Sequence, residues 1–178
     1  MKYKLGDLIE LIDIKNTDGI VTVFYGININ KEFMPTFANT DNLDPKKYKV
    51  LKKGQFLFSG AQTGRDICIR IALFNKDQPV IVSPSYTIFC LNKYAESILL
   101  PEYLSMLFMR KEMDRYGWFL SDSSIRSNLD WDRFCNIELD LPPLDIQQKY
   151  VAVYQAMLAN QRAYEQGLDD LKLVCDVG

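Results

Sequence analysis

The stretch Leu141-Pro142-Pro143-Leu144-Asp145-Ile146-Gln147-Gln148 decides how this chain is organised. A proline pair at this place is suited to end an extended segment and to begin a helix. The residues after it have helical spacing as far as the end of the chain. We therefore expect one compact domain over residues 1–142, followed by one long amphipathic helix over residues 143–178.

The helix carries a narrow stripe whose members alternate steps of four and three residues. The stripe consists of Ile146, Tyr150, Val153, Met157, Asn160, Tyr164, Gly167, Leu171 and Val174. This spacing is typical of the seam of a left-handed coiled coil, and a helix lying on a core has a wider stripe. At about 1.5 Å per residue, a helix over residues 144–175 is roughly 48 Å long, which exceeds what a small domain covers. The pattern predicts a homodimer through this helix, and the alternative is a terminal helix folded back on its own domain.

Two members of the seam depart from the apolar pattern. Asn160 is polar, and a buried asparagine in a seam fixes register and partner number more often than it adds stability. Gly167 costs about 1 kcal/mol of helix propensity relative to alanine, and the register is free to shift there because Leu168 is adjacent. The seam is therefore imperfect but continuous.

Composition limits the chain to one domain and one appendage. With 178 residues and 48% hydrophobic content, it can bury one core of ordinary size. Its four cysteines are far apart and form no C-x-x-C pair, which predicts reduced thiols rather than disulfides or zinc ligands. The sequence has neither a signal peptide nor an apolar run long enough to span a bilayer. We expect a soluble cytoplasmic protein.

The domain is predicted to be an α+β fold, with a twisted, mostly antiparallel sheet or partial barrel and a packed helix. Short runs of β-branched and aromatic residues, bounded by turn residues, predict strands at 20–25, 55–59, 68–74, 80–82, 86–91 and 136–141. One helix is expected to begin at Pro101 and to stop at Gly117. Its broad apolar surface predicts burial against the sheet. Asp130 is expected to cap a further helix start.

Charge and the absence of histidine restrict the chemistry. Residues 1–142 carry 18 basic and 18 acidic side chains, whereas residues 143–178 carry 3 and 5, so an anionic partner would have to meet local basic patches. The densest patch includes Lys52 and Lys53, although a lysine run is usually only a solvated face. With no histidine, the common proton shuttle and the His-dependent nucleophiles are absent. We expect no catalytic residues, no metal and no cofactor.

The segment Ser59-Gly60-Ala61-Gln62-Thr63-Gly64-Arg65 follows a predicted strand. It lacks the Lys-Ser/Thr pair of a nucleotide-hydrolysing P-loop, and the residues after it indicate another strand instead of a helix. A glycine-bracketed hairpin tip describes it better. Such a tip is either a contact loop or a turn without function.

Several short motifs, in this order and spacing, resemble those of type I restriction–modification specificity subunits. They lie at 5–8 (Leu-Gly-Asp-Leu), 48–58, 60–64, 82–86, 101–104, 123–126, 141–144 and 147–148. The chain is similar to one half of such a subunit, with one target recognition domain and one conserved spacer helix. Asp145-Ile146 stands where the family usually has glutamate before the glutamine. Family members generally contain two recognition domains, whereas this chain contains one copy.

The resemblance implies a non-catalytic subunit that reads half of a split site in double-stranded DNA and positions methyltransferase and restriction subunits. Lysines would contact phosphates, and polar loop side chains would contact base edges. The expected DNA-binding residues are Lys52, Lys53, Gln62, Thr63, Arg65, Tyr86, Ser123, Ser124 and Arg126. Tyr86 is equally compatible with packing inward, and Arg126 with a structural ion pair.

Two other classes of function remain open on the sequence. One is a protein-interaction adaptor that uses the coiled-coil helix and never touches DNA. The other is a small hydrolase or nucleotide-binding enzyme, which the missing histidine and P-loop lysine disfavour.

Overall fold

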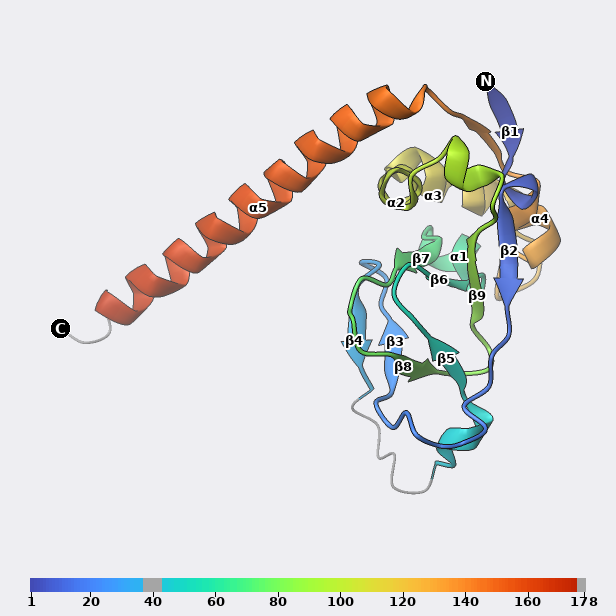
Figure 1. The fold of residues 1–178 in the computed structure, drawn as a ribbon, viewed down its shortest axis with the longest axis horizontal. Coiled ribbons are helices and arrows are strands. Elements are labelled where there is room, and N and C mark those ends of the chain that lie inside the picture. Colours follow the sequence, from blue (N-terminus) through green and yellow to red (C-terminus); the bar gives the residue numbers. More distant parts are fainter. Residues whose placement is uncertain (37–42, 176–178) are drawn as a thin grey trace.

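A computed structural model describes residues 1–36 and 43–175 (Figure 1). The domain is α+β, and its largest sheet has four antiparallel strands in the order β2-β9-β6-β7. These strands are β2 (Ile9–Ile12), β9 (Thr87–Leu91), β6 (Phe56–Ser59) and β7 (Arg70–Leu73). The predicted antiparallel character is confirmed, and the described strands form no closed barrel.

Three two-stranded antiparallel sheets accompany the large one. The pairs are β1 (Lys2–Lys4) with β10 (Glu138–Asp140), β3 (Tyr25–Ile27) with β4 (Phe33–Pro35), and β5 (Lys49–Leu51) with β8 (Val80–Val82). Because β1 pairs with β10, the beginning of the chain lies beside the segment that leads into the last helix.

Five of the six predicted strands are present, most of them shortened at their ends, and the prediction for residues 20–25 is wrong except at Tyr25, where β3 begins. The reason lies in the buried Asn16. Its side-chain amide donates to Val21 O (2.7 Å) and Pro45 O (3.2 Å) and accepts from Val21 N (3.2 Å). This amide satisfies backbone groups that a neighbouring strand would otherwise have to pair.

The expected single helix from Pro101 to Gly117 is two helices, α2 (Pro101–Phe108) and α3 (Lys111–Leu120). The chain breaks after Phe108, whose carbonyl accepts a hydrogen bond from the buried Lys31 ammonium. Lys31 also pairs with Asp114 of α3 at 2.7 Å. Gly117 does not stop a helix but lies inside α3, where an added Cβ would be 2.4 Å from Ile69 Cγ1. The glycine therefore permits close packing of α3 on the segment before β7.

Two hydrophobic clusters lie on opposite sides of the large sheet, with α2 to α4 on one side and the small sheets β3-β4 and β5-β8 on the other (Figure 1). In the first cluster, Phe58 stacks on Phe134 of α4 (Trp131–Cys135), with ring centroids 4.1 Å apart. The carboxylate of Asp130 accepts from Arg133 N at 2.8 Å and caps α4 as predicted. The buried residues at the centre of the second cluster include Leu57, Phe74 and Ile88.

The last helix, α5, runs from Leu144 to Cys175, as the sequence predicts; residues 176–178 lie outside the described part. Its first turns pack on α2, and Gln147 and Val151 are buried there. Gln147 is fully buried, and its amide is satisfied there: it donates to Ile98 O and Pro142 O and accepts from Leu100 N. Folding back onto the domain is thus limited to the first turns, and the remainder projects away from it (Figure 1).

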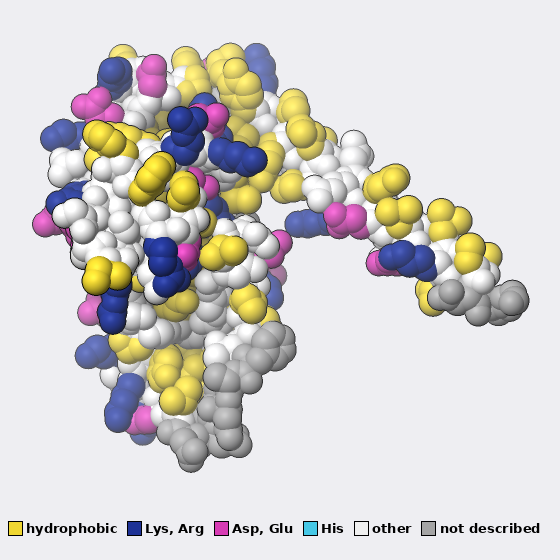
Figure 2. Space-filling model, turned by 180° about the vertical axis from the view of Figure 1, so that it is seen from behind, with side chains coloured by type: hydrophobic (Ala, Val, Ile, Leu, Met, Phe, Trp, Pro, Cys, Tyr) yellow, Lys and Arg dark blue, Asp and Glu magenta, His cyan; other side chains and the backbone are white. Residues whose placement is uncertain are grey.

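Most of the predicted seam is exposed in the single chain. Hydrophobic side chains are visible along the projecting helix (Figure 2). Met157 is 63% exposed and Tyr164 70% exposed, and the same side of the helix bears the exposed Tyr150, Val153, Leu171 and Val174. None of the described helices is both long and apolar enough to cross a membrane.

Candidate nucleic-acid interface

The connection between β6 and β7 contains one helical turn, α1 (Thr63–Asp66), bracketed by left-handed residues. Gln62 has φ 59° and Ile67 has φ 47°. The sequence predicted a tight, glycine-bracketed hairpin tip between two strands, and the structure has a helical turn within it. The turn forms because Thr63 Oγ1 donates to Gly60 O (3.0 Å) and Asp66 N donates to Gln62 O (2.9 Å).

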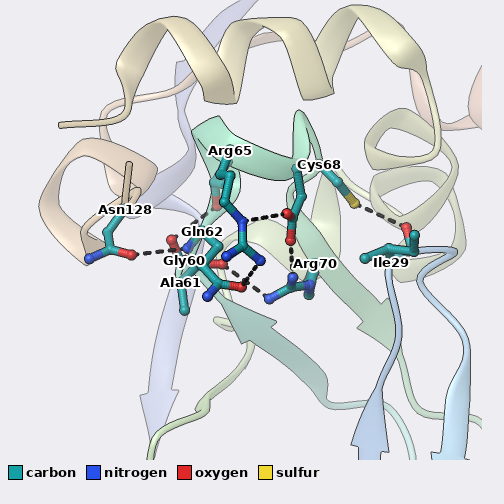
Figure 3. A network of polar contacts seen from close by, with 10 residues as sticks. Ile29, Gly60, Ala61, Gln62, Arg65, Cys68, Arg70 and Asn128 are labelled. Carbon is teal, nitrogen blue, oxygen red and sulfur yellow. Dashed lines mark hydrogen bonds and ion pairs between the residues drawn. The ribbon is translucent and has the colours of Figure 1, made fainter. Parts of the chain in front are cut away.

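An ionic network fixes the side chains on this turn (Figure 3). Asp66 accepts from Arg65 Nε at 3.0 Å and from Arg70 through its second oxygen. Arg65 Nη2 donates to Gln62 Oε1 at 2.7 Å, and Arg70 Nη1 donates to Ala61 O at 3.1 Å. Because two guanidinium groups share one carboxylate, the turn keeps an excess positive charge.

A second segment, residues 121–130, is held in shape by Asp122. One carboxylate oxygen of Asp122 accepts from Ser124 N (3.1 Å), Ser124 Oγ (2.5 Å) and Asn128 N (3.0 Å). These hydrogen bonds, above all that from the Ser124 hydroxyl, lower the pKa of Asp122 below its ordinary value. The carboxylate is therefore ionised at neutral pH and keeps the loop closed.

Backbone and side-chain hydrogen bonds join the two segments. Gln62 N donates to Asn128 Oδ1 (2.9 Å), Gly64 N to Ser127 O (2.8 Å) and Leu129 N to Gly60 O (2.8 Å). An added Cβ at Gly60 would lie 1.7 Å from Leu129 O. The glycine thus allows an approach of the two backbones that any side chain would block. We call residues 60–65 and 121–130 together the contact segments.

An open hollow of about 590 Å³ lies between the contact segments and the start of β9. Its apolar lining comes from Phe58, Leu129 and Trp131, and its polar side chains are Gln62, Thr87, Arg126 and Asn128. Arg126 is exposed and makes no hydrogen bond or ion pair within the described residues. A structural ion pair for Arg126, which the sequence left open, is not formed there.

Six of the nine expected DNA-binding residues lie on the contact segments, and five of these are exposed or half-buried: Gln62, Arg65, Ser123, Ser124 and Arg126. Thr63 is a correction, because it is fully buried and its hydroxyl is hydrogen-bonded to Gly60 O. Tyr86 is half-buried and packs against the second hydrophobic cluster.

Lys52 and Lys53 lie apart from the contact segments. They occupy the turn between β5 and β6, which precedes the first residue of β6, whereas Gln62 and Arg65 follow its last. Both lysines are exposed, and Lys53 Nζ is 2.6 Å from Asp77 Oδ1.

Sequence reasoning missed Asp122 and Asn128, whose only signal was their place in a polar stretch beside the Ser123-Ser124 motif.

The family comparison agrees with this architecture. The model of the "Type I restriction modification DNA specificity domain" matches residues 1–170. The chain belongs to this family. None of the curated proteins matches the sequence of this specificity domain.

Two solved structures share the fold of the specificity domain. The HsdS subunit from Thermoanaerobacter tengcongensis is similar with a TM-score of 0.63 and 19% identity over 91% of this chain. A chain from a study of complex assembly and conformational transition of the type I R-M system has a TM-score of 0.55 and 17% identity over 98% of this chain. In each case the match spans 43% of the solved chain, so this chain corresponds to less than half the length of either.

Proposed function

We propose that this chain is the sequence-reading part of a type I restriction–modification complex and recognises one half of a bipartite site in double-stranded DNA. The observation that carries the proposal is the family match over residues 1–170. In this proposal the chain performs no catalytic step and positions methyltransferase and restriction subunits on DNA. The histidine-free composition supports a non-catalytic role, because the usual proton shuttle is missing.

The contact segments support the DNA-reading part of the proposal. Their exposed Arg65 and Arg126 carry positive charge, and Gln62, Ser123 and Ser124 add short polar groups of the kind that contact base edges. All five side chains are on the contact segments, whose backbone is fixed by hydrogen bonds. Lys52 and Lys53 are assigned to phosphates farther along the duplex, and Tyr86, being half-buried, to the margin of the interface.

The exposed seam of α5 supports the assembly part. An antiparallel pair with its two-fold axis between residues 158 and 159 places Val153 of one copy against Tyr164 of the other, and Ile146 against Leu171. The sums of these residue numbers are equal, so the seam matches itself when reversed. A two-fold dimer of this kind supplies the two reading domains that a split site requires, with equivalent half-sites.

Salt dependence and point variants test this function. The dimer should bind its selected duplex with a log K that falls linearly with log salt, since lysines and arginines displace counterions. Arg65→Ala should weaken binding to the selected duplex by about 1–3 kcal/mol, because a base contact is lost. Lys53→Ala should weaken all duplexes alike and reduce the salt slope by about one unit.

Lys93→Ala is the matched control, since Lys93 is exposed, follows the last residue of β9 and lies outside the proposed interface. Melting temperatures of all three variants should stay at the wild-type value. Absence of binding to every duplex, even at low salt, would favour the other candidate, an adaptor that uses only α5.

A further inference from the structure

The hollow between the contact segments has an unusual hydrogen-bonding character, because the amide groups of Gln62 and Asn128 can each take only one orientation. Gln62 Oε1 accepts from Arg65 Nη2, and Asn128 Oδ1 accepts from Gln62 N. Both partners are obligate donors, so the atom facing each of them must be the amide oxygen. The two NH₂ groups are left without partners among the described residues.

The guanidinium of Arg126 adds further donors to the same hollow. It lines the hollow with Gln62 and Asn128 and is not engaged by any described residue. Arginine has five N–H donors and no acceptor. Three side chains from the two joined contact segments therefore present donors to one space.

Acceptors around this space are mostly occupied. Gly60 O accepts from both Leu129 N and Thr63 Oγ1, and Ala61 O accepts from Arg70 Nη1. The nearby carboxylates are also engaged, since Asp122 holds its own loop and Asp130 binds Arg133. The hydroxyl of Thr87 is the one side-chain group of the lining that can either donate or accept.

We propose that this hollow reads the acceptor edge of a guanine in the major groove, and that Asn128, Gln62 and Arg126 determine this specificity. Guanine presents two adjacent acceptors there, N7 and O6, whereas adenine and cytosine each present an amino donor. The three donor side chains pair with guanine, and they offer no acceptor to the amino groups of adenine and cytosine. The inference rests on the proposed DNA-reading function and makes it specific: each half-site contains a guanine opposite the hollow.

A DNA phosphate group also accepts hydrogen bonds and is the other acceptor to consider. A variant that loses a guanine contact changes the sequence preference, whereas a variant that loses a phosphate contact leaves it unchanged. The guanine edge is favoured because two of the three donors are neutral amides and the lining includes the apolar Phe58, Leu129 and Trp131. Phosphate contacts rest mainly on cationic side chains and carry no sequence information.

The test is selection of binding sites from a randomised duplex library by the purified full chain, with wild type and Asn128→Asp compared. The aspartate keeps an oxygen for Gln62 N but replaces the outward NH₂ with a second oxygen, so it turns a donor into an acceptor at nearly constant shape. Wild type should enrich one guanine in each half-site. Asn128→Asp should replace it with cytosine or adenine at the same position and lower affinity for the guanine duplex by about 10- to 100-fold.

Two further variants keep the test decisive. Arg126→Gln cannot disturb a described contact, because the arginine makes none, and it should also lose the guanine preference. Gln148→Glu introduces the same charge change on an exposed position of α5 and should leave the selected sequence unchanged.

Each outcome bears on a different claim. If wild type enriches no sequence, the DNA-reading function itself fails. If wild type enriches a motif without this guanine, or Asn128→Asp and Arg126→Gln keep the wild-type motif, only the guanine assignment fails. If both variants weaken every duplex equally, the hollow binds phosphate.

Discussion

The contact segments and the second half of α5 differ in what they leave unsatisfied. In the contact segments, backbone and side-chain polar groups are paired within the chain, and the surplus consists of a few donors and positive charges. In α5 beyond Leu158, the surplus is apolar: Tyr164 and Leu171 are exposed to 70% and 62%. The difference teaches that the contact segments are held in shape within one chain, whereas the exposed face of α5 is apolar and suited to pack against a second protein surface.

The free energy expected from binding also differs between the contact segments and α5. Burying a large apolar side chain contributes about 1.5–3 kcal/mol, and the seam presents several such side chains at regular spacing. The contact segments gain from order instead, because a surface whose loops are already fixed loses less conformational entropy when it binds. A variant in one of the two regions should therefore leave the properties of the other region unchanged.

The largest effect is expected from a charge in the seam. Met157→Glu should weaken self-association by about 100-fold or more, because an unpaired carboxylate in a helix pair costs about 3–5 kcal/mol. Sedimentation equilibrium gives the association constant directly. The structure of the domain over residues 1–142 should be unchanged, since Met157 is 63% exposed in the single chain.

Ala159→Glu is the control for this variant, because residue 159 is exposed and lies off the seam. Its association constant should stay near that of wild type. Equal dissociation of the two variants, or an undisturbed dimer with Met157→Glu, would show that the seam is not the pairing surface.

Two glycines inside helices allow a matched comparison of stability in the domain and in α5. Gly117→Ala should lower the free energy of unfolding by about 1–3 kcal/mol, because the new methyl group overlaps Ile69. Gly167→Ala meets no atom within 4 Å and should stabilise α5 by about 1 kcal/mol through helix propensity. Urea unfolding followed by circular dichroism measures both, and shifts of the same sign would contradict the account.

The smallest effect concerns the pH dependence of the 121–130 loop. Hydrogen bonds lower the pKa of Asp122 in the folded chain, so their stabilisation is present above the ordinary value of 3.8 and is lost as pH falls through the lower, folded-state value. An NMR titration of the Asp122 carboxyl should show a midpoint below 3.8 for wild type. Ser124→Ala should raise it, because the Ser124 hydroxyl is the largest cause of the shift.

Ser123→Ala is the matched control for this titration, since Ser123 is exposed and makes no hydrogen bond to Asp122 within the described residues. Its midpoint should equal that of wild type. Identical midpoints in the two serine variants would argue against the Ser124 hydrogen bond.

The sequence predicted those parts of the fold that depend on local pattern. The strand at Val80–Val82 follows from a run of β-branched residues and the helix from Leu144 follows from helical spacing, and both are present. The errors come from long-range contacts. Asn16 donates to the carbonyl of Pro45, 29 residues away, and Lys31 caps the carbonyl of Phe108, 77 residues away.

The candidate site shows the same limit. Gln62, Arg65 and Arg126 could be named from loop composition, because exposed polar residues in loops are common contact residues. Thr63 looked equivalent in sequence, but it is buried under the turn that it stabilises. Asn128 could not be found this way, because its importance depends on a hydrogen bond to a residue 66 positions earlier.

The central claim, that one copy reads half a site and two copies read the whole, is tested most directly by the stoichiometry of the DNA complex. Sedimentation velocity of the purified chain on its selected duplex should give two chains per duplex, and the selected sequence should be two inverted half-sites separated by an unspecified gap. One chain per duplex, bound to a single uninterrupted motif, would contradict the account.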